Sequence, residues 1–362
     1  MATARRASLG LSLVALAVSA CQASASPAVS PSPSVSLESA EPSAPSAEPS
    51  QAATGWRELT VAGGPGPRSD HTWTVDPGAE VAYLFGGQPA AGSGALADLW
   101  AYSLVNDTWT QLAGGPPARF GHNAEWVPGV GLVIFAGQDG ATFRNDLWAY
   151  DLDAGTWSEL TAGGAVPVPR YGSCAALGPE GRLWISHGFT SDSGRFADTR
   201  AYDFTTSTWT DETPVGDAPV ERCLHGCWWA GDAFNLYAGQ TTGTTALGDW
   251  WALTVGPRPG TNSWAEVPIG GDGLPPRNLY ALTAFRGGHL VFGGQTLDGS
   301  YLDDGWLIDH EGAPADVPPT SPRPTARAGA ELVTDLERGR VLLFGGRDAS
   351  GPQADVWELA VP

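Results

Sequence analysis

A block of about fifty residues recurs six times in this sequence, and this repetition constrains the fold more than any other feature. Its clearest copy, residues 119–160, holds four short apolar runs separated by turn residues. Successive copies open on arginines that lie 51, 51, 52, 55 and 50 residues apart. Units of this length bury their apolar faces only against neighbouring copies, so the sequence predicts a closed array of six similar units. The six opening residues are Arg68, Arg119, Arg170, Arg222, Arg277 and Arg327.

Three further positions recur inside each block. An apolar run ends 17 to 19 residues after the arginine at a glycine, as at Gly87. An aspartate then precedes an aromatic residue by two positions, as with Asp146 and Trp148, although Arg200 takes the aromatic position in the third block. The chain of 362 residues contains 48 Gly, 30 Pro and 16 Trp, which fits short strands between tight turns and argues against long helices. In four blocks a turn leads to a last tryptophan: Trp109, Trp157, Trp209 and Trp264.

This pattern resembles the kelch repeat, with an arginine and often a histidine at the first strand, a glycine pair after the second, and aromatic residues on the third and fourth. The resemblance covers residues 56–362 and points to the galactose oxidase and kelch-like superfamily. It implies an all-β fold, a six-bladed β-propeller whose blades are four-stranded antiparallel sheets around an axis. The predicted blades are residues 68–113, 119–161, 170–212, 222–267, 277–316 and 327–360, the last completed by 55–60.

The two ends of the repeat array complement each other. The sixth block has expected strands near 328–333, 340–344 and 355–360 and then ends without a fourth. The segment from Gly55 to Thr60, which contains Trp56, has the character of that missing strand. We predict that it pairs with the last block, which closes the ring and removes an exposed sheet edge. The fifth block lacks a tryptophan after Trp306 and contains several prolines, so its outer strand is expected to be short or absent.

The N-terminus suggests export. Residues 1–20 resemble a secretory signal peptide, because arginines precede an apolar stretch that is shorter than the about 20 residues a membrane helix needs. The sequence Val18-Ser19-Ala20-Cys21 resembles a bacterial lipobox, which implies a lipid on Cys21; an ordinary signal peptide cut nearby is the alternative. Residues 21–54 are mostly Ala, Ser, Pro and Glu and are expected to form a disordered tether. The expected location is the outer face of the bacterial cytoplasmic membrane, with residues 55–362 as the folded domain.

Charge narrows the range of partners. The chain has 19 basic residues, all arginines, and 39 acidic residues, which gives a net charge of −20. An acidic surface repels polyanions, so nucleic acid is not an expected partner. The only expected membrane contact is the lipid anchor, and a monomer is expected.

The opening arginines allow two interpretations. As six cations at one end of the axis, they could accept a carboxylate through bidentate contacts. Alternatively, each pairs with an aspartate or carbonyl of its own or the next blade, which we favour because a residue found in every repeat usually serves the repeat. His71, His122 and His225 follow three residues after their arginines and are further candidate ligand contacts. No carboxylate motif accompanies them, so a metal site is not expected.

Catalysis is not favoured by the motifs present. Copper oxidases on kelch propellers use two His, a Tyr and a Tyr–Cys crosslink. Tyr171 and Tyr280 lie near expected strand starts with Cys174 close by, but their spacing does not assemble that arrangement, and they remain candidate ligand contacts. Hydrolase, zinc-protease and phosphate-loop motifs are absent from the sequence, and no cofactor is expected. The alternative function is an extracytoplasmic enzyme on a kelch propeller, similar to a mutarotase, an oxidase or a glutaminyl cyclase.

Three cysteines remain besides Cys21, and an exported chain permits disulfides. Cys223 and Cys227 lie four apart on one expected strand, roughly 13 Å, which is too far for a bridge. Cys174 lies four residues after its arginine and Cys227 five after its own, so they would face each other from the third and fourth blades. We predict a Cys174–Cys227 disulfide with Cys223 left over. Three buried free thiols are the alternative.

Variable segments follow the closing glycines and should gather at the same end of the propeller as the arginines. Loops on a rigid scaffold commonly carry function, and aromatic and guanidinium groups anchor interfaces. The sequence therefore favours a non-catalytic module that presents this end to a protein or a glycan. The candidate contacts are Phe143, Arg144, Phe196, Tyr301 and Arg347. The segments are 88–97, 138–145, 189–197, 240–248, 295–303 and 347–354.

Overall fold

The computed structural model describes residues 55–90, 94–191, 194–242, 246–258, 260–270, 274–309 and 312–360. Every regular element in these ranges is a β-strand. The described residues contain no helix that is long and apolar enough to span a membrane. Cys21, the signal segment 1–20 and the tether 21–54 lie outside the described residues, so their assignments stay predictions. The strands are β1 (Gly55–Leu59), β2 (Thr72–Asp76), β3 (Val81–Phe85), β4 (Leu99–Ser103), β5 (Thr108–Leu112), β6 (Asn123–Val127), β7 (Gly131–Phe135), β8 (Leu147–Asp151), β9 (Thr156–Glu159), β10 (Gly163–Gly164), β11 (Cys174–Leu177), β12 (Leu183–Phe189), β13 (Arg195–Asp203), β14 (Thr208–Asp211), β15 (Gly226–Ala230), β16 (Ala233–Gln240), β17 (Ala246–Thr254), β18 (Ser263–Val267), β19 (Ala281–Phe285), β20 (Gly288–Phe292), β21 (Gly305–Ile308), β22 (Pro314–Asp316), β23 (Ala328–Asp335), β24 (Arg340–Asp348), β25 (Gly351–Pro352) and β26 (Val356–Ala360).

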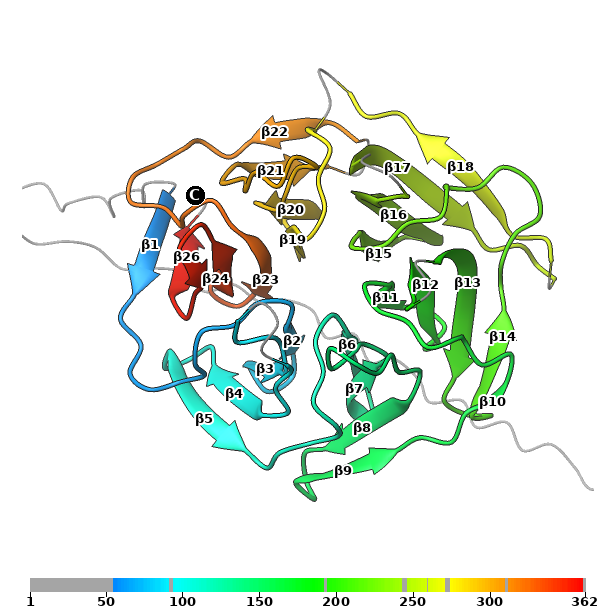
Figure 1. Ribbon diagram of the computed structural model, residues 1–362, viewed down its shortest axis with the longest axis horizontal. Helices are drawn as coiled ribbons and strands as arrows, with labels where there is room; N and C mark the ends of the chain where they lie inside the picture. Colours follow the sequence, from blue (N-terminus) through cyan, green and yellow to red (C-terminus); the bar gives the residue numbers. More distant parts are fainter. Residues whose placement is uncertain are drawn as a thin grey trace, which may run out of the picture. The chain divides into compact units, whose positions relative to one another are not determined.

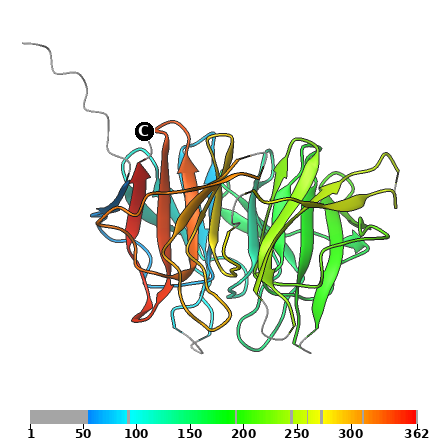
Figure 2. The same cartoon turned by 90° about the horizontal axis from the view of Figure 1, so that it is seen from above.

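Six blades, each with four antiparallel strands, stand around one axis, which confirms the predicted β-propeller (Figure 1); the short β10 adds a parallel pair at the rim of the third blade, and β25 pairs with β24. Viewed from the side, their strands run between two opposite ends of the propeller (Figure 2). We call the end that carries the opening arginines and the variable segments the arginine end, and the other the opposite end. From the axis outward the blades are β2-β3-β4-β5, β6-β7-β8-β9, β11-β12-β13-β14, β15-β16-β17-β18, β19-β20-β21-β22 and β23-β24-β26-β1.

The hydrophobic core lies between the blades. In the second blade, all residues of β7 are buried, whereas β9 at the rim is mostly exposed. Tyr83 and Phe85 of the first blade pack in one cluster with Leu132 and Ile134 of the second. A blade is therefore apolar on both faces, and each face is covered by a neighbour, as the repeat length predicts.

The N-terminal segment closes the ring as predicted. β1 pairs antiparallel with β26, with Trp56 opposite Leu359 (Figure 1). The Trp56 side chain is 6% exposed, and its ring centre lies 5.0 Å from that of Phe292 in the fifth blade. The outer strand of the fifth blade, which the sequence predicted to be short or absent, is present but short: β22 has three residues and begins at Pro314.

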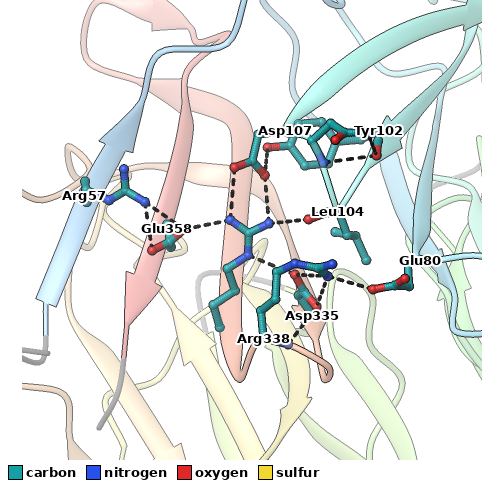
Figure 3. A network of polar contacts seen from close by, with 11 residues as sticks. Arg57, Glu80, Tyr102, Leu104, Asp107, Asp335, Arg338 and Glu358 are labelled. Atoms are coloured by element: carbon teal, nitrogen blue, oxygen red, sulfur yellow. Dashed lines mark hydrogen bonds and ion pairs between the residues drawn. The ribbon is translucent and has the colours of Figure 1, made fainter. Parts of the chain in front are cut away.

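A polar network reinforces the seam between the sixth and first blades (Figure 3). Arg340, at the start of β24, donates hydrogen bonds to Asp335 and Glu358 in its own blade. The same guanidinium reaches the first blade, where it donates to both carboxylate oxygens of Asp107 and to the carbonyl of Leu104. This arginine therefore joins the last blade to the first by side-chain contacts.

A disulfide links two neighbouring inner strands. Cys174 of β11 and Cys227 of β15 are bonded, the pair that the sequence favours, with Cα atoms 5.7 Å apart. Cys223 is buried as a free thiol.

Candidate functional site

The six opening arginines are buried and paired within their own blades. Arg119 is typical: it is 0% exposed and donates to the two carboxylate oxygens of Asp146 at 2.7 and 2.8 Å. Its guanidinium also donates to the carbonyl of Ala136 at 2.9 Å. The idea of six free cations around an opening is therefore wrong, because their donors serve the blades. The matching pairs are Arg68–Asp98, Arg170–Asp198, Arg222–Asp249, Arg277–Asp304 and Arg327–Asp355.

The aspartate in each pair also explains the aromatic residue two positions later. The indole N–H of Trp148 donates to Asp146 at 2.8 Å, and four other blades repeat this contact. In the third blade Arg200 donates instead, to Asp198 at 3.1 Å. Burial raises the pKa of Asp146, but the hydrogen bonds and charge of Arg119 outweigh it and hold that pKa below its usual range. The departure in the third block thus preserves the same contact.

A ring of backbone hydrogen bonds surrounds the axis at the arginine end. Each participating residue lies two positions after an opening arginine, has a φ between 53° and 65°, and donates its N–H to its counterpart in the preceding blade. The six N···O distances lie between 2.8 and 3.2 Å, and the last blade connects back to the first. We call these residues the axial ring: Asp70, Gly121, Gly172, Leu224, Leu279 and Gly329.

An aromatic cluster lies beyond the axial ring on the second and third blades. The ring of Phe120 meets that of Tyr171 at 5.7 Å, and Phe143 meets Phe189 at 5.8 Å, both in edge-on geometry. Backbone pairing of Tyr171 with Phe189 joins the two contacts. The guanidinium of Arg195 lies 5.7 Å from the centre of the Phe189 ring. Phe143, Tyr171 and Phe189 are only half-buried, so their rings remain partly accessible at this end.

The sixth blade adds a charged group to the same end. Arg347 donates to the Asp70 carboxylate and to the Ser69 hydroxyl. Burial lowers the pKa of Arg347, but the charge of Asp70 and the nearby Tyr171 and Tyr301 outweigh it and raise that pKa. Arg347 is therefore held beside Asp70 and stays charged.

The remaining loop candidates separate into two groups. Phe143 joins the aromatic cluster, and Arg144 pairs with Asp139 at 2.6 Å on the same variable segment. Phe196 instead lies under the buried Arg170, whose guanidinium carbon is 4.4 Å from its ring centre. This half-buried ring therefore packs on the buried ion pair, and its role as a loop contact stays a prediction.

The histidine and second tyrosine candidates support the packing between blades. Burial lowers the pKa of His71 to about 3, and its ring lies edge-on to Phe344 at 5.4 Å. His122 shares a hydrogen bond of 2.9 Å with Thr72, and burial holds its pKa well below the usual range, as it does for His225. The Tyr280 hydroxyl donates to the carbonyl of Tyr237 and accepts from an amide, both at 2.7 Å. Across the described ranges, no three His, Cys, Asp or Glu side chains gather as a metal site.

A cavity of about 740 Å³ runs along the axis below the axial ring. Two carboxylates on inner strands line it, Glu125 of β6 and Glu331 of β23, and sequence reasoning missed both. Burial raises the pKa of each to about 8, with a further contribution from Asp70 at Glu331. The repeat alignment could have revealed them. Glu331 lies four residues after its opening arginine and Glu125 lies six after its own, at positions where the first blade has Thr72 and Thr74.

A family model described as the KLHDC2/KLHL20/DRC7 Kelch-repeats domain matches residues 51–239, just over half of the chain. Among curated proteins, the chain is 32% identical over 199 residues to acyl-CoA-binding domain-containing protein 5 of Arabidopsis thaliana, covering 52% of this chain and 29% of that protein. It is 29% identical over 163 residues to the F-box/kelch-repeat protein At1g51550 of the same plant, covering 40% and 32%. The chain thus spans about a third of these relatives.

Among solved structures, that of YjhT has a TM-score of 0.65 at 16% identity, over 82% of this chain and 95% of that chain. At this identity the similarity concerns the fold.

Proposed function

Because this chain belongs to the kelch-repeat domain family, we propose that it is a non-catalytic binding module that presents its arginine end to a protein or a glycan. Propellers of this family generally mediate protein binding. The scaffold suits the task, since each arginine is locked within its blade and the variable segments lie on a rigid ring.

The observation that carries the proposal is the aromatic cluster of Phe120, Phe143, Tyr171 and Phe189. Aromatic rings supply large apolar contact area and favour edge-on or stacked partners, whether side chains or the faces of sugars. Arg195 over Phe189 adds a cation beside this surface. A partner with an apolar face and neighbouring acceptor groups would complement it.

The proposal includes the expected location. A lipid on Cys21 and a tether over residues 21–54 would hold the propeller at the outer face of the cytoplasmic membrane. A binding module there meets its partners outside the cytoplasm, where the Cys174–Cys227 disulfide would also persist.

The test is a binding measurement with glycan and peptide arrays, using the purified full chain. The variant Phe143→Ala removes a half-buried ring from the cluster. We expect at least about a tenfold loss of affinity for the ligands that the native chain selects, because a central aromatic anchor typically contributes 2 kcal/mol or more.

Val105→Ala is the matched control, since Val105 is 52% exposed in the β4–β5 turn at the opposite end. Its affinities should equal those of the native chain. Unchanged binding by Phe143→Ala would place the site elsewhere, and turnover of a sugar substrate would favour the enzymatic alternative.

A further inference from the structure

The axial cavity is large enough for a small organic ligand, whose sites commonly measure 300–1,000 Å³. Its lining begins at the axial ring and Tyr171 and extends to Pro77, Pro128 and Leu336 at the opposite end. Leu336 is 74% exposed, so the cavity opens to solvent there. This opening lies at the end away from the aromatic cluster, although Tyr171 of that cluster lines the inner end of the cavity.

The wall of the cavity is acidic. Asp70, Glu125 and Glu331 line it, and none of the described lining residues is an arginine, although the Asp70 carboxylate is paired with Arg347 of the sixth blade. The sequence contains no lysine. Four histidines line the cavity, and three of them, His71, His122 and His225, have pKa values lowered by burial, so these three add no positive charge near neutral pH. Glu125 and Glu331, whose pKa values burial raises to about 8, are largely protonated near neutral pH and would ionise on pairing with a bound cation.

Neither glutamate is paired with a cation among the described residues. Glu331 and Glu125 come from the sixth and second blades, on either side of the first. Between them, the Thr72 hydroxyl is hydrogen-bonded to the His122 ring, and the Thr74 hydroxyl donates to the carbonyl of Ala124. Asp70 adds a further acceptor at the inner end, because its Oδ1 atom is buried without a hydrogen-bond partner and the residue is 7% exposed.

We propose that the axial cavity binds an aliphatic ammonium compound, with Glu125 and Glu331 as the counter-charges. Glu125 and Glu331 are half-buried, and a partly desolvated carboxyl group without a cationic partner favours its neutral form; a bound ammonium reverses this preference by charge pairing. Two carboxyl groups in different parts of the wall suit a ligand with two ammonium groups. Asp70 Oδ1 can accept a further N–H at the inner end.

Titration calorimetry on the full chain with 1,4-diaminobutane at physiological ionic strength tests this site, with 1,4-butanediol as the neutral comparison. We expect the diamine to bind and the diol not to bind. Glu125→Gln and Glu331→Gln keep size and remove charge, and each should weaken diamine binding by at least about tenfold. Thermal denaturation checks that both variants are folded.

Asp153→Asn is the control for general attraction to an acidic protein, since Asp153 is exposed on the β8–β9 turn. It should bind the diamine as the native chain does. The proposal is overturned by an absence of diamine binding, or by equal affinities for the native chain and the two glutamine variants. Either result would leave the proposed function of the arginine end unaffected, because that function depends on Phe143 and its neighbours.

Discussion

At the residue scale, the closing glycine pair shows which identities the fold requires. The first position has a φ between 58° and 67° in all six blades and accepts Gly, Ala136, His187 or Ala238. The second has a φ between 86° and 111° and is always glycine. A Cβ at Gly87 would lie 2.8 Å from that of His71, and the other blades leave similarly little room. The amide of this glycine donates to the carbonyl of the next opening arginine, so each closing turn also connects two blades.

The buried ion pairs give the prediction at this scale. Arg119→Met leaves the Asp146 carboxylate without its main partner, and we expect the free energy of unfolding to fall by about 3–5 kcal/mol. Adding Asp146→Leu should recover part of this loss, because an apolar pair of similar volume avoids an unpaired charge. Urea denaturation of both variants measures the two changes.

Arg57→Met is the control, because the Arg57 side chain is 65% exposed in its ion pair with Glu358. It should cost roughly 0–1 kcal/mol. Equal costs for the exposed and the buried arginine would contradict the role given to the repeat-wide pairs.

At the element scale, β1 is the strand on which closure depends. It covers the edge of β26 and places Trp56 against the fifth blade. An uncovered edge strand presents unpaired amides and carbonyls that can pair with another chain.

Trp56→Ala should lower the free energy of unfolding by about 3–5 kcal/mol, the usual range for a buried tryptophan. Loss of the strand should also increase self-association, which light scattering after size-exclusion chromatography detects. Glu58→Ala, at an exposed position of the same strand, is the matched control and should change neither quantity. A stable, monomeric Trp56→Ala variant would mean that the seam network around Arg340 suffices for closure.

At the scale of the whole molecule, buried titratable groups of opposite kinds shape the pH dependence of stability. The pKa values of His71 and His187 fall to about 3, and those of His122 and His225 are also well below normal. These histidines bind protons more readily in the unfolded chain, so stability decreases as pH falls below about 6.5. Glu125 and Glu331, with pKa values near 8, bind protons more readily in the folded chain. Their contribution to the free energy of unfolding is therefore lost as pH rises from about 4.5 to 8.

We therefore expect a stability maximum near pH 6.5, with each group changing the free energy of unfolding by about 1.4 kcal/mol per pH unit within its window. Urea denaturation at several pH values measures the profile. The Glu125→Gln/Glu331→Gln double variant should lose the decline between pH 6.5 and 8, and its stability should fall more steeply from pH 6.5 to 4.5, because the opposing contribution of the glutamates is gone. An unchanged alkaline side in that variant would contradict the placement of both glutamates.

The sequence alone determined the repeat count, the strand order of each blade and the closure by Trp56, because these follow from local spacing and from the need of apolar faces for neighbours. It also favoured the Cys174–Cys227 pair, since alternation along a strand fixes which face a residue takes. Only the tertiary structure decided where the arginines point, because free and paired guanidinium groups have the same sequence pattern. The axial ring and the cavity with Glu125 and Glu331 likewise emerge only when six blades meet around one axis, since each is formed by residues about fifty positions apart.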